Sequence, residues 1–278
     1  MAALISSAAQ QEIPKIVAVP RVTEDGTAVT GFPLREQAFR LTQIDLSHEA
    51  EEAERHAQAR RICQQEANTA FDLSTGPLIR GQVIKLSAEL HILMLNMHHI
   101  ISDGWSLGVM IKEFSQIMER LRVGKEVNLE PLPIQYVDYS VWQRKYLGEG
   151  GILEQQLGYW REKLSGVAET LDLVTDYPRG GVTSTAGARH LFTLDSGLSA
   201  QLKRLSEQQG STLFMTLLAA FNGLLYRYTG QHDICLGSPI ANRHYGETEG
   251  LIGMFVNTLA LRNQVDGEQG FDALLAQV

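Results

Sequence analysis

A run of apolar residues at positions 92–97 limits most strongly what this chain can fold into. Side chains alternate between the two faces of a strand, and apolar residues on both faces are typical of a strand that other elements cover on both sides. A second apolar run at 78–86 precedes it, with three polar or small residues at 87–89 between them. The two runs predict a β-hairpin whose second strand is central in a sheet.

Helical periodicity follows directly after the hairpin. From position 107 to 121 apolar residues recur at spacings of three and four, which predicts an amphipathic helix that Gly124 ends. We expect further helices at 47–70 with Ser47 as its cap, at 134–146, 153–164 and 198–209, at 213–228 with Ser211 as its cap, and from 271 onward. We expect further strands at 39–46, 189–194, 233–240 and 254–262. This mixed order favours an α/β two-layer fold over a barrel or a sandwich.

Length and turn residues predict the domain organisation. At about 150 residues per domain, the 278 residues correspond to two compact units or one large one. The segment 171–187 contains two Asp, one Pro and three Gly and has little periodicity, so it is the expected linker. We therefore expect a poorly defined segment at 1–22, an amino-terminal lobe at 23–170, and a carboxy-terminal lobe at 188–278.

Charge and cysteine content exclude several classes of function. Lys and Arg number 24 and Asp and Glu 32, a net charge of −8, whereas nucleic-acid binding needs a basic surface. Residues 1–11 contain no Lys or Arg, and no run of about 18 uncharged apolar residues exists, so we expect neither a signal peptide nor a membrane span. Cys63 and Cys235 do not form a disulfide framework and are interpreted as small buried hydrophobic residues. We expect a cytoplasmic protein that binds no nucleic acid and no membrane.

The residues best suited to chemistry lie at 97–106, with the sequence Met-His-His-Ile-Ile-Ser-Asp-Gly-Trp-Ser. If the strand continues through both histidines, His98 and His99 face opposite sides, and only one of them faces a cleft. Adjacent strand positions chelate a metal poorly, and neither H-E-x-x-H nor C-x-x-C is present, so we expect no metal site.

Asp103 and Gly104 lie where the strand passes into the helix. An acid at this position can cap the helix, join a buried ion pair or orient a catalytic imidazole, and the first two roles are favoured. Gly104 would allow the backbone to approach a ligand or to adopt a conformation closed to other residues. The helix amino terminus would offer N–H donors to a developing oxyanion.

The ten residues at 97–106 resemble the signature of the condensation domains of non-ribosomal peptide synthetases. Blocks at 136–142 and 252–262 resemble the same family, as do shorter stretches at 71–78 and 237–243, and all occur in the family's order. The resemblance implies a fold like that of chloramphenicol acetyltransferase, with two lobes in a V. Two motifs of the family at each end have no counterpart, so we expect an internal fragment, incomplete at both ends and not active alone.

The resemblance also implies a reaction. A donor acyl or peptidyl thioester would react with the amino group of an acceptor aminoacyl thioester, both carried on phosphopantetheine arms that enter a tunnel between the lobes. His99 would be the catalytic residue, acting either as a base or by positioning the amine. The implied structural residues are His98, Asp103, Gly104 and Arg243, and Asp103 would pair with Arg243 of the other lobe. Ser102, Trp105 and Asn257 would line the tunnel.

The implied partners are upstream and downstream peptidyl carrier domains and an adjacent adenylation domain, and the domain itself would bind no cofactor. Asp138, Tyr139 and Trp142 fall at helical spacing and are expected in the core or at a lobe contact. Two alternatives stay open: an epimerisation domain of the same superfamily, and a carrier-binding module or inactive fragment without turnover.

Overall fold

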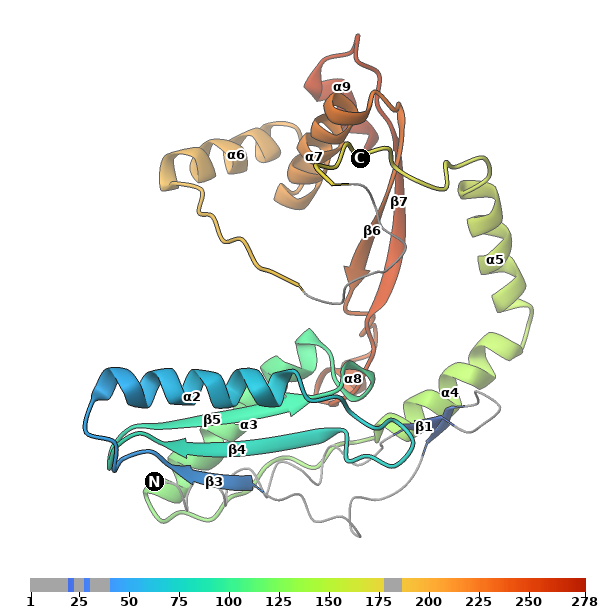
Figure 1. Ribbon diagram of the computed structural model, residues 1–278. Coiled ribbons are helices and arrows are strands. Elements are labelled where there is room, and N and C mark those ends of the chain that lie inside the picture. The colour runs from blue at the N-terminus through green and yellow to red at the C-terminus, as the bar shows by residue number, and fades with distance from the viewer. Residues whose placement is uncertain (1–19, 23–27, 31–40, 178–186) are drawn as a thin grey trace. The chain divides into compact units, whose positions relative to one another are not determined.

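A computed structural model describes residues 20–22, 28–30, 41–177 and 187–278, and Figure 1 shows their arrangement into helices and strands. Most of the segment predicted at 1–22 and part of the linker predicted at 171–187 lie outside the described residues. Up to α4, the elements are β1 (Pro20–Val22), β2 (Ala28–Thr30), β3 (Leu41–Asp45), α2 (Glu52–Ala67), β4 (Ile79–Lys85), β5 (His91–Met97), η2 (His99–Ile101), α3 (Gly104–Arg122) and α4 (Tyr136–Gly148). They are followed by α5 (Ile152–Lys163), α6 (Ser196–Gln208), α7 (Leu213–Thr229), β6 (Asp233–Ile240), α8 (Gly246–Glu249), β7 (Asn257–Gln264) and α9 (Phe271–Gln277).

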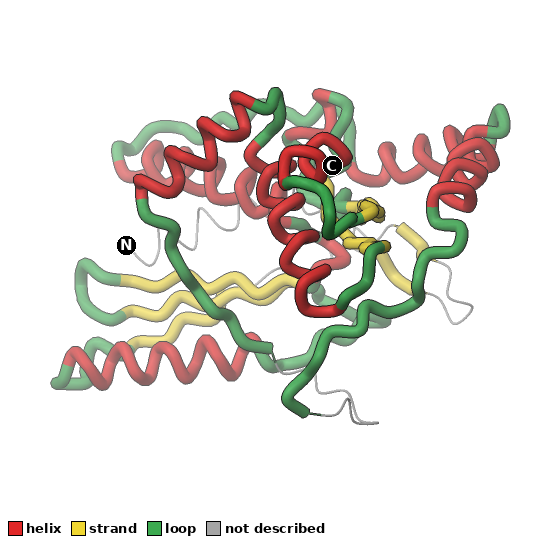
Figure 2. The backbone as a smooth tube through the Cα atoms, turned by 90° about the horizontal axis from the view of Figure 1, so that it is seen from above, coloured by secondary structure: helices red, strands yellow, loops and turns green. Residues whose placement is uncertain are grey.

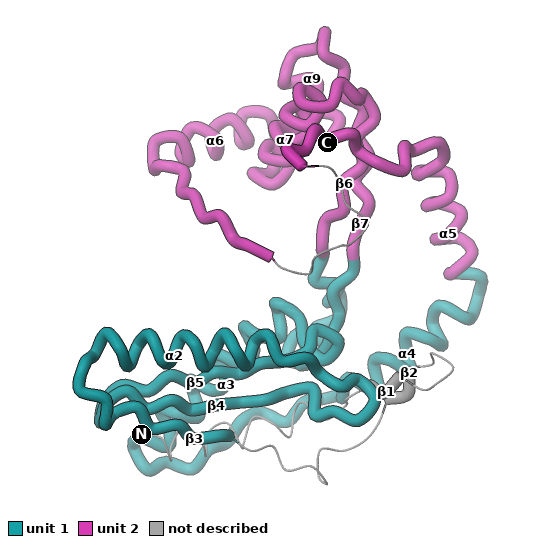
Figure 3. The backbone as a smooth tube through the Cα atoms, viewed as in Figure 1, with its two compact units in different colours: residues 1–152, 240–257 teal, residues 153–239, 258–278 magenta. Residues whose placement is uncertain are grey.

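The chain forms two compact units, and their boundaries differ from the predicted lobes. The first unit contains residues 1–152 and 240–257, and the second contains 153–239 and 258–278 (Figure 3). The segment 240–257 belongs to the first unit because three of its apolar side chains are buried there, Leu251, Ile252 and Phe255. Periodicity alone gives no sign of this return of the chain.

The sheet of the first unit is built around β4. Its strand order is β3-β4-β5, with β3 parallel to β4, and β4 and β5 form the predicted hairpin, from Ile79 opposite Met97 to Lys85 opposite His91. Within the described residues β5 therefore lies at the edge of the sheet, so the expected central position is wrong.

Both faces of the sheet are apolar because each packs against a helix. Ile84 packs with Ala59 of α2, whereas Ile79 packs with Met110 of α3. The odd and even positions of β4 point to opposite faces, so the two clusters lie on opposite sides of the sheet. Figure 2 shows the strands and the flanking helices from above. Coverage on both sides, which the apolar run of β5 predicted, is confirmed.

Two predicted helix caps are wrong. Ser47 does not cap α2, because its N–H and hydroxyl donate to Asp45 Oδ1 at 2.9 and 2.5 Å in the turn after β3. Glu51 is the residue before α2. The cap of α7 is Thr212, whose hydroxyl accepts the N–H of Met215 at 3.2 Å. Ser211 precedes it directly, but only one of two neighbouring hydroxyls can occupy the cap position.

The second unit has its core between α7, α9 and the strands β6 and β7, where Leu225, Ile234 and Val265 are buried. The strand predicted at 189–194 is wrong, since these residues form no regular structure and Leu191 is 80% exposed. Alternating side chains do not make a strand unless a neighbour pairs with the backbone N–H and C=O groups, and no described strand does so here.

The two cysteines have similar environments. Cys63 and Cys235 are both half-buried and both free. We expected both side chains to be buried, and neither is fully buried. Cys63 packs at the edge of the cluster between α2 and the sheet. Among the helices that the structure describes, none has the length and apolar character needed to cross a membrane.

Candidate functional site

The histidine pair lies in a turn and not in a continuing strand. β5 ends at Met97, and a single 3-10 turn, η2, begins at His99. His98 precedes this turn, and its Nδ1 accepts the N–H of Ile100 at 3.1 Å. An imidazole nitrogen that accepts a hydrogen bond carries no proton, so the neutral His98 ring holds its proton on Nε2.

The turn gives the two histidines different surroundings. His98 is half-buried, its N–H donates to the carbonyl of Leu78 at 3.0 Å, and its ring meets the ring of Phe71 edge-on, with centroids 6.0 Å apart. His99 is exposed. One histidine is therefore packed and the other is open, as expected, but the turn and not strand alternation separates them.

Asp103 caps α3 and also joins a buried ion pair. Its Oδ1 accepts the N–H and the hydroxyl of Ser106 at 2.8 and 2.7 Å, and its Oδ2 accepts the N–H of Phe255 at 3.0 Å. Arg243 Nη2 lies 3.2 Å from Oδ1, and the two side chains are 0% and 1% exposed. Burial alone would raise the pKa of Asp103, but the hydrogen bonds from Ser106 and Phe255 and the charge of Arg243 outweigh it and lower that pKa.

The predicted pairing of Asp103 with Arg243 is confirmed, but it does not join two lobes. Arg243 lies in the segment 240–257, so both partners belong to the first unit. Its Nη1 donates to the carbonyls of Thr248 and Leu251, the latter at 2.8 Å, and its guanidinium carbon lies 4.0 Å from the Phe255 ring centroid. Burial lowers the pKa of Arg243, and the charge of Asp103 opposes that effect.

Ser106 is a central residue of the site that the sequence did not single out. It is completely buried, and its hydroxyl lies 3.1 Å from the N of Gly253, 2.9 Å from the O of Gly253 and 3.0 Å from Arg243 Nη2. Arg243 and the Gly253 N–H fill the two acceptor positions of the hydroxyl, and its one hydrogen is shared between Asp103 Oδ1 and the Gly253 carbonyl. The sequence does hint at the importance of Ser106 and Gly253, because each lies in one of the family-like blocks. It does not show that the two residues are in contact.

A third family-like block meets the other two at Gly253. A Cβ atom on this glycine would lie 2.2 Å from Cδ2 of Tyr136, a distance that real side chains do not reach. The Tyr136 hydroxyl donates to the carbonyl of Met254 at 2.8 Å. Tyr139, one turn further along α4, is buried with Phe255, as its predicted core role requires. Blocks 97–106, 136–142 and 252–262 therefore converge in one place.

Asp138 and Trp142 are two further residues of the block at 136–142, and their contacts differ. Asp138 Oδ2 accepts the N–H of Gln135 at 2.8 Å at the start of the helix. Trp142 stacks on Tyr146 with centroids 5.1 Å apart and meets Tyr245 edge-on at the same distance. Trp142 therefore packs against neighbouring rings, as expected. Asp138 is instead exposed and caps the helix, so the core or lobe-contact role expected for it is wrong.

Gly104 and the residues proposed to line a tunnel do not share one environment. Ser102 is buried and extended after η2, whereas Asn257 is exposed at the start of β7. Gly104 has the ordinary negative φ of the first residue of α3, so it needs no special conformation, although the space beside it is open. Because Asp103 already binds the N–H of Ser106, the helix end also offers fewer free donors than expected. A tunnel position for these residues stays a prediction.

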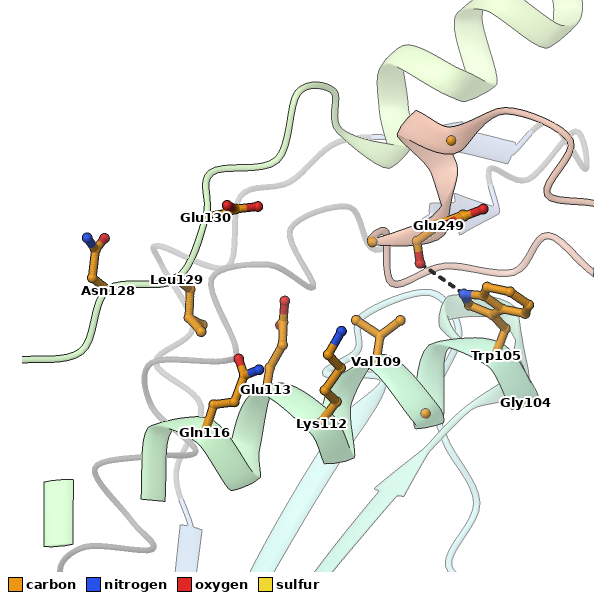
Figure 4. A pocket seen from close by; sticks show the side chains of 13 residues that line it. Gly104, Trp105, Val109, Lys112, Glu113, Gln116, Asn128, Leu129, Glu130 and Glu249 are labelled. Carbon is orange, nitrogen blue, oxygen red and sulfur yellow. Dashed lines mark hydrogen bonds between the residues drawn. The ribbon is translucent and has the colours of Figure 1, made fainter. Parts of the chain in front are cut away.

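A cavity of about 820 Å³ lies in the first unit, along the outer face of α3 (Figure 4). Trp105 and Lys112 line it from the helix, and Glu130 and Glu249 from two other segments. The Trp105 indole N–H donates to the carbonyl of Glu249 at 2.9 Å, the dashed line in Figure 4. Neither histidine is among the described lining residues, so this cavity is distinct from the histidine turn.

The structure brings no set of metal ligands together in the residues it describes, where no three His, Cys, Asp or Glu side chains gather. What the site offers is an exposed imidazole on a turn that is fixed at both ends. His98 holds the start of the turn, and Asp103, Ser106 and Arg243 hold the segment after it.

Comparison with known proteins identifies the family. The condensation-domain profile matches residues 21–278. The chain is 49% identical over 238 residues to a linear gramicidin synthase of Brevibacillus parabrevis, a match that covers 86% of this chain and 3% of that protein. It is 41% identical over 238 residues to the phosphinothricin tripeptide synthetase PhsC of Streptomyces viridochromogenes, which covers 86% of this chain and 22% of the synthetase.

Solved structures show the same fold at lower identity. The first condensation domain of the CDA synthetase has a TM-score of 0.76 at 21% identity, covering 99% of this chain and 65% of the other. The epimerization domain of tyrocidine synthetase, TycB3(E), has a TM-score of 0.82 at 20% identity, covering 100% and 64%. The chain thus spans less than two thirds of these structures and a small part of the synthetases.

The chain therefore belongs to the condensation-domain family, and its relatives are peptide synthetases. The family and the mixed α/β fold that the motifs predicted are both confirmed.

Proposed function

We propose that the chain catalyses amide formation between a donor acyl or peptidyl thioester and the amino group of an acceptor aminoacyl thioester, with His99 as the catalytic residue. The observation that supports this most is that the polar residues of the block at 97–106 fall into two kinds, those that hold the local structure and one that is exposed. Nδ1 of His98, the carboxylate of Asp103 and the hydroxyl of Ser106 are taken up by bonds inside the protein, while the His99 imidazole is exposed.

In the proposed step the acceptor nitrogen attacks the donor carbonyl carbon. A C–N bond forms, the C–S bond breaks, the donor thiol leaves, and the nitrogen loses a proton. An α-amino group has an ordinary pKa of about 8, so about a tenth of the amine is already neutral at pH 7, and a strong base is not needed. His99 then either accepts the proton or orients the amine, and general-base catalysis of this kind contributes about 10²–10⁴-fold.

The substrates would arrive on the phosphopantetheine arms of two carrier domains, with an adenylation domain adjacent. This part of the proposal is supported by the relatives, which are much longer synthetases. The chain covers only 3% and 22% of the two described above. The domain itself would hold no cofactor. We place the reaction in the cytoplasm, where the free thiols of Cys63 and Cys235 stay reduced.

Epimerisation is the second candidate, because an epimerization domain shares the fold with a TM-score of 0.82. That reaction removes and returns the α-proton of a tethered aminoacyl group and forms no new amide. A third possibility is binding without turnover, because the X-domain from teicoplanin biosynthesis, solved in complex with OxyB, also matches, with a TM-score of 0.80 and 23% identity. Since the fold is common to all three, only the chemistry distinguishes them.

The test uses this chain grafted in place of the matching 238 residues of the linear gramicidin synthase, supplied with loaded donor and acceptor carriers. We expect amide product by mass spectrometry, and a loss of about 10²-fold or more in its rate with His99→Ala. His48→Ala, which changes a histidine before α2, is the matched control and should not alter the rate. An unchanged rate in His99→Ala would contradict the proposed role of His99. Deuterium uptake at the α-carbon from D₂O without amide product would favour epimerisation.

A further inference from the structure

The turn between α2 and β4 belongs to a family-like stretch at 71–78 that the proposed reaction does not explain. The Asp72 carboxylate organises it: Oδ1 accepts the N–H and the hydroxyl of Ser74 at 2.8 and 2.6 Å, and Oδ2 accepts the hydroxyl of Thr75 at 2.6 Å. Gly76 closes the turn at φ +65°, and its N–H donates to the carbonyl of Asp72 at 2.9 Å. A turn fixed so closely presents the preceding side chain, Phe71, in one place.

Phe71 lies between a cation and the first histidine. The guanidinium carbon of Arg80 is 3.8 Å from the centroid of the Phe71 ring, a cation–π distance. The ring of His98 meets Phe71 at an interplanar angle of 86°, with centroids 6.0 Å apart, which is the edge-to-face geometry that aromatic pairs prefer. Phe71 also packs against the cluster of Leu78 and Ile101.

Arg80 is itself anchored to the end of α2. Its Nε donates to the carboxylate of Glu66, and its Nη2 and Nη1 donate to the carbonyls of Thr69 and Ala70, at 2.6 and 3.3 Å. Glu66 is held in turn by Gln82 Nε2 at 3.2 Å. A guanidinium with three fixed acceptors cannot turn away, so it keeps the Phe71 ring in its position.

From these contacts we infer that Phe71 and Arg80 are positioning residues that act through His98 to hold the turn carrying His99. The inference rests on the proposed role of His99 in amide formation. The contacts form one continuous series, from the end of α2 through Arg80 and Phe71 to the His98 ring and the N–H of Ile100.

The turn needs such support because it is short. A 3-10 turn of three residues has poor hydrogen-bond geometry and little stability of its own. Its cap, the bond from the Ile100 N–H to His98 Nδ1, exists only while the His98 ring keeps its orientation. A ring free to rotate would release Ile100, and the position of His99, between the two, would no longer be defined.

The first test is amide hydrogen exchange of the full chain in the variant Phe71→Leu, which keeps an apolar side chain but removes the ring. We expect the Ile100 amide to exchange about tenfold faster, the size of effect an aromatic pair produces. The amide of Val83, in the middle of the sheet, should be unchanged. Phe114→Leu is the matched control, since it removes a half-buried ring from α3 in the same unit.

An Ile100 amide that exchanges at the wild-type rate in Phe71→Leu would overturn the inference, as would an equal acceleration in Phe114→Leu. If Phe71→Leu does not fold, Arg80→Met carries the test, with Arg61→Met as its control. Arg61 pairs with Glu54 on the exposed side of α2, so its loss should leave Ile100 unaffected. Faster exchange at Ile100 in Arg80→Met alone supports the inference.

The second test measures the rate of amide formation in the grafted domain. With His99 present, Phe71→Leu should lower kcat about tenfold, because the contact between the Phe71 and His98 rings is lost. In the His99→Ala background, adding Phe71→Leu should not lower kcat any further. Independent effects that multiply in the double variant would overturn the inference. If His99→Ala keeps the wild-type rate, the proposed function fails, whereas exchange at Ile100 still decides whether Phe71 and Arg80 hold the turn.

Discussion

Two Arg–Asp pairs in this chain differ in opposite directions in contact distance and in burial. Arg262 and Asp233, on β7 and β6, form the closer pair, with Nη2 and Nε of Arg262 at 2.6 and 2.9 Å from the carboxylate oxygens. Arg243 and Asp103 approach only to 3.2 Å, but they are 1% and 0% exposed, whereas Arg262 and Asp233 are 18% and 26% exposed. The comparison teaches that contact distance is a poor guide to what an ion pair holds together.

The difference lies in what depends on each pair. Arg262 also donates to the carbonyls of Lys163 and Ser165 at 3.0 and 2.8 Å, which ties the end of α5 to the sheet of the second unit. Asp103 and Arg243 instead connect α3 with the buried segment 240–257 through Ser106 and the backbone of Phe255. Removing one partner of the buried pair therefore leaves a charge without solvent, while removing one partner of the other pair leaves a charge that water can reach.

The largest effect should come from Asp103→Ala. The substitution leaves Arg243 charged and buried and removes the cap of α3, so we expect the free energy of unfolding of the first unit to fall by about 3–5 kcal/mol. Urea denaturation gives the size, and hydrogen exchange in β4 compared with β6 assigns the loss to the first unit. A folded, equally stable Asp103→Ala with slow amide formation would contradict this structural role.

The pH dependence of stability provides a second check on the role of Asp103. The pKa of Asp103 is lower in the folded protein than in the unfolded chain, so its contribution is present above about pH 4, its ordinary pKa, and is lost as the pH falls through the folded value. The difference in unfolding free energy between wild type and Asp103→Asn should therefore shrink in acid. A difference that grows as the pH falls would contradict the direction of the shift.

A smaller effect is expected for Ser106→Ala. Its hydroxyl is buried and serves Asp103, Arg243 and the backbone of Gly253, so its loss leaves polar groups unsatisfied and should cost about 1–3 kcal/mol. Ser115→Ala is the control on the same helix, because Ser115 is exposed and its hydroxyl donates to the carbonyl of Ile111 one turn earlier. Equal stability of the two variants in urea would show that Ser106 is not a centre of the site.

The same contrast explains what the sequence could predict. The hairpin of β4 and β5 was predictable because its strands lie close together in the chain and their pattern is local. The contact of Ser106 with Gly253 was not, since it joins residues 147 positions apart and depends on how two segments pack. The pair of Asp103 with Arg243 was found only through the family resemblance, because neither charge pattern nor spacing points to it.

Local errors have physical causes of the same kind. The exposed segment at 189–194 has the alternation of a strand but no described partner for its backbone. The histidines were treated as a continuing strand, because Met97, His98 and His99 show no turn residue. The turn forms there because the His98 ring caps it, which is a side-chain effect that periodicity does not detect.

The smallest effect should come from Asp233→Ala. Arg262 is partly exposed, so water can replace the carboxylate, and we expect the second unit to lose about 1 kcal/mol. The contribution should also weaken in 1 M salt, because the Debye length there is about 3 Å and exposed charges are screened. Glu149→Ala, which breaks the more exposed pair with Lys145, is the control and should change stability less. If high salt reduces the effect of Asp103→Ala as much as that of Asp233→Ala, burial is not what distinguishes the two pairs, and the contrast between them fails.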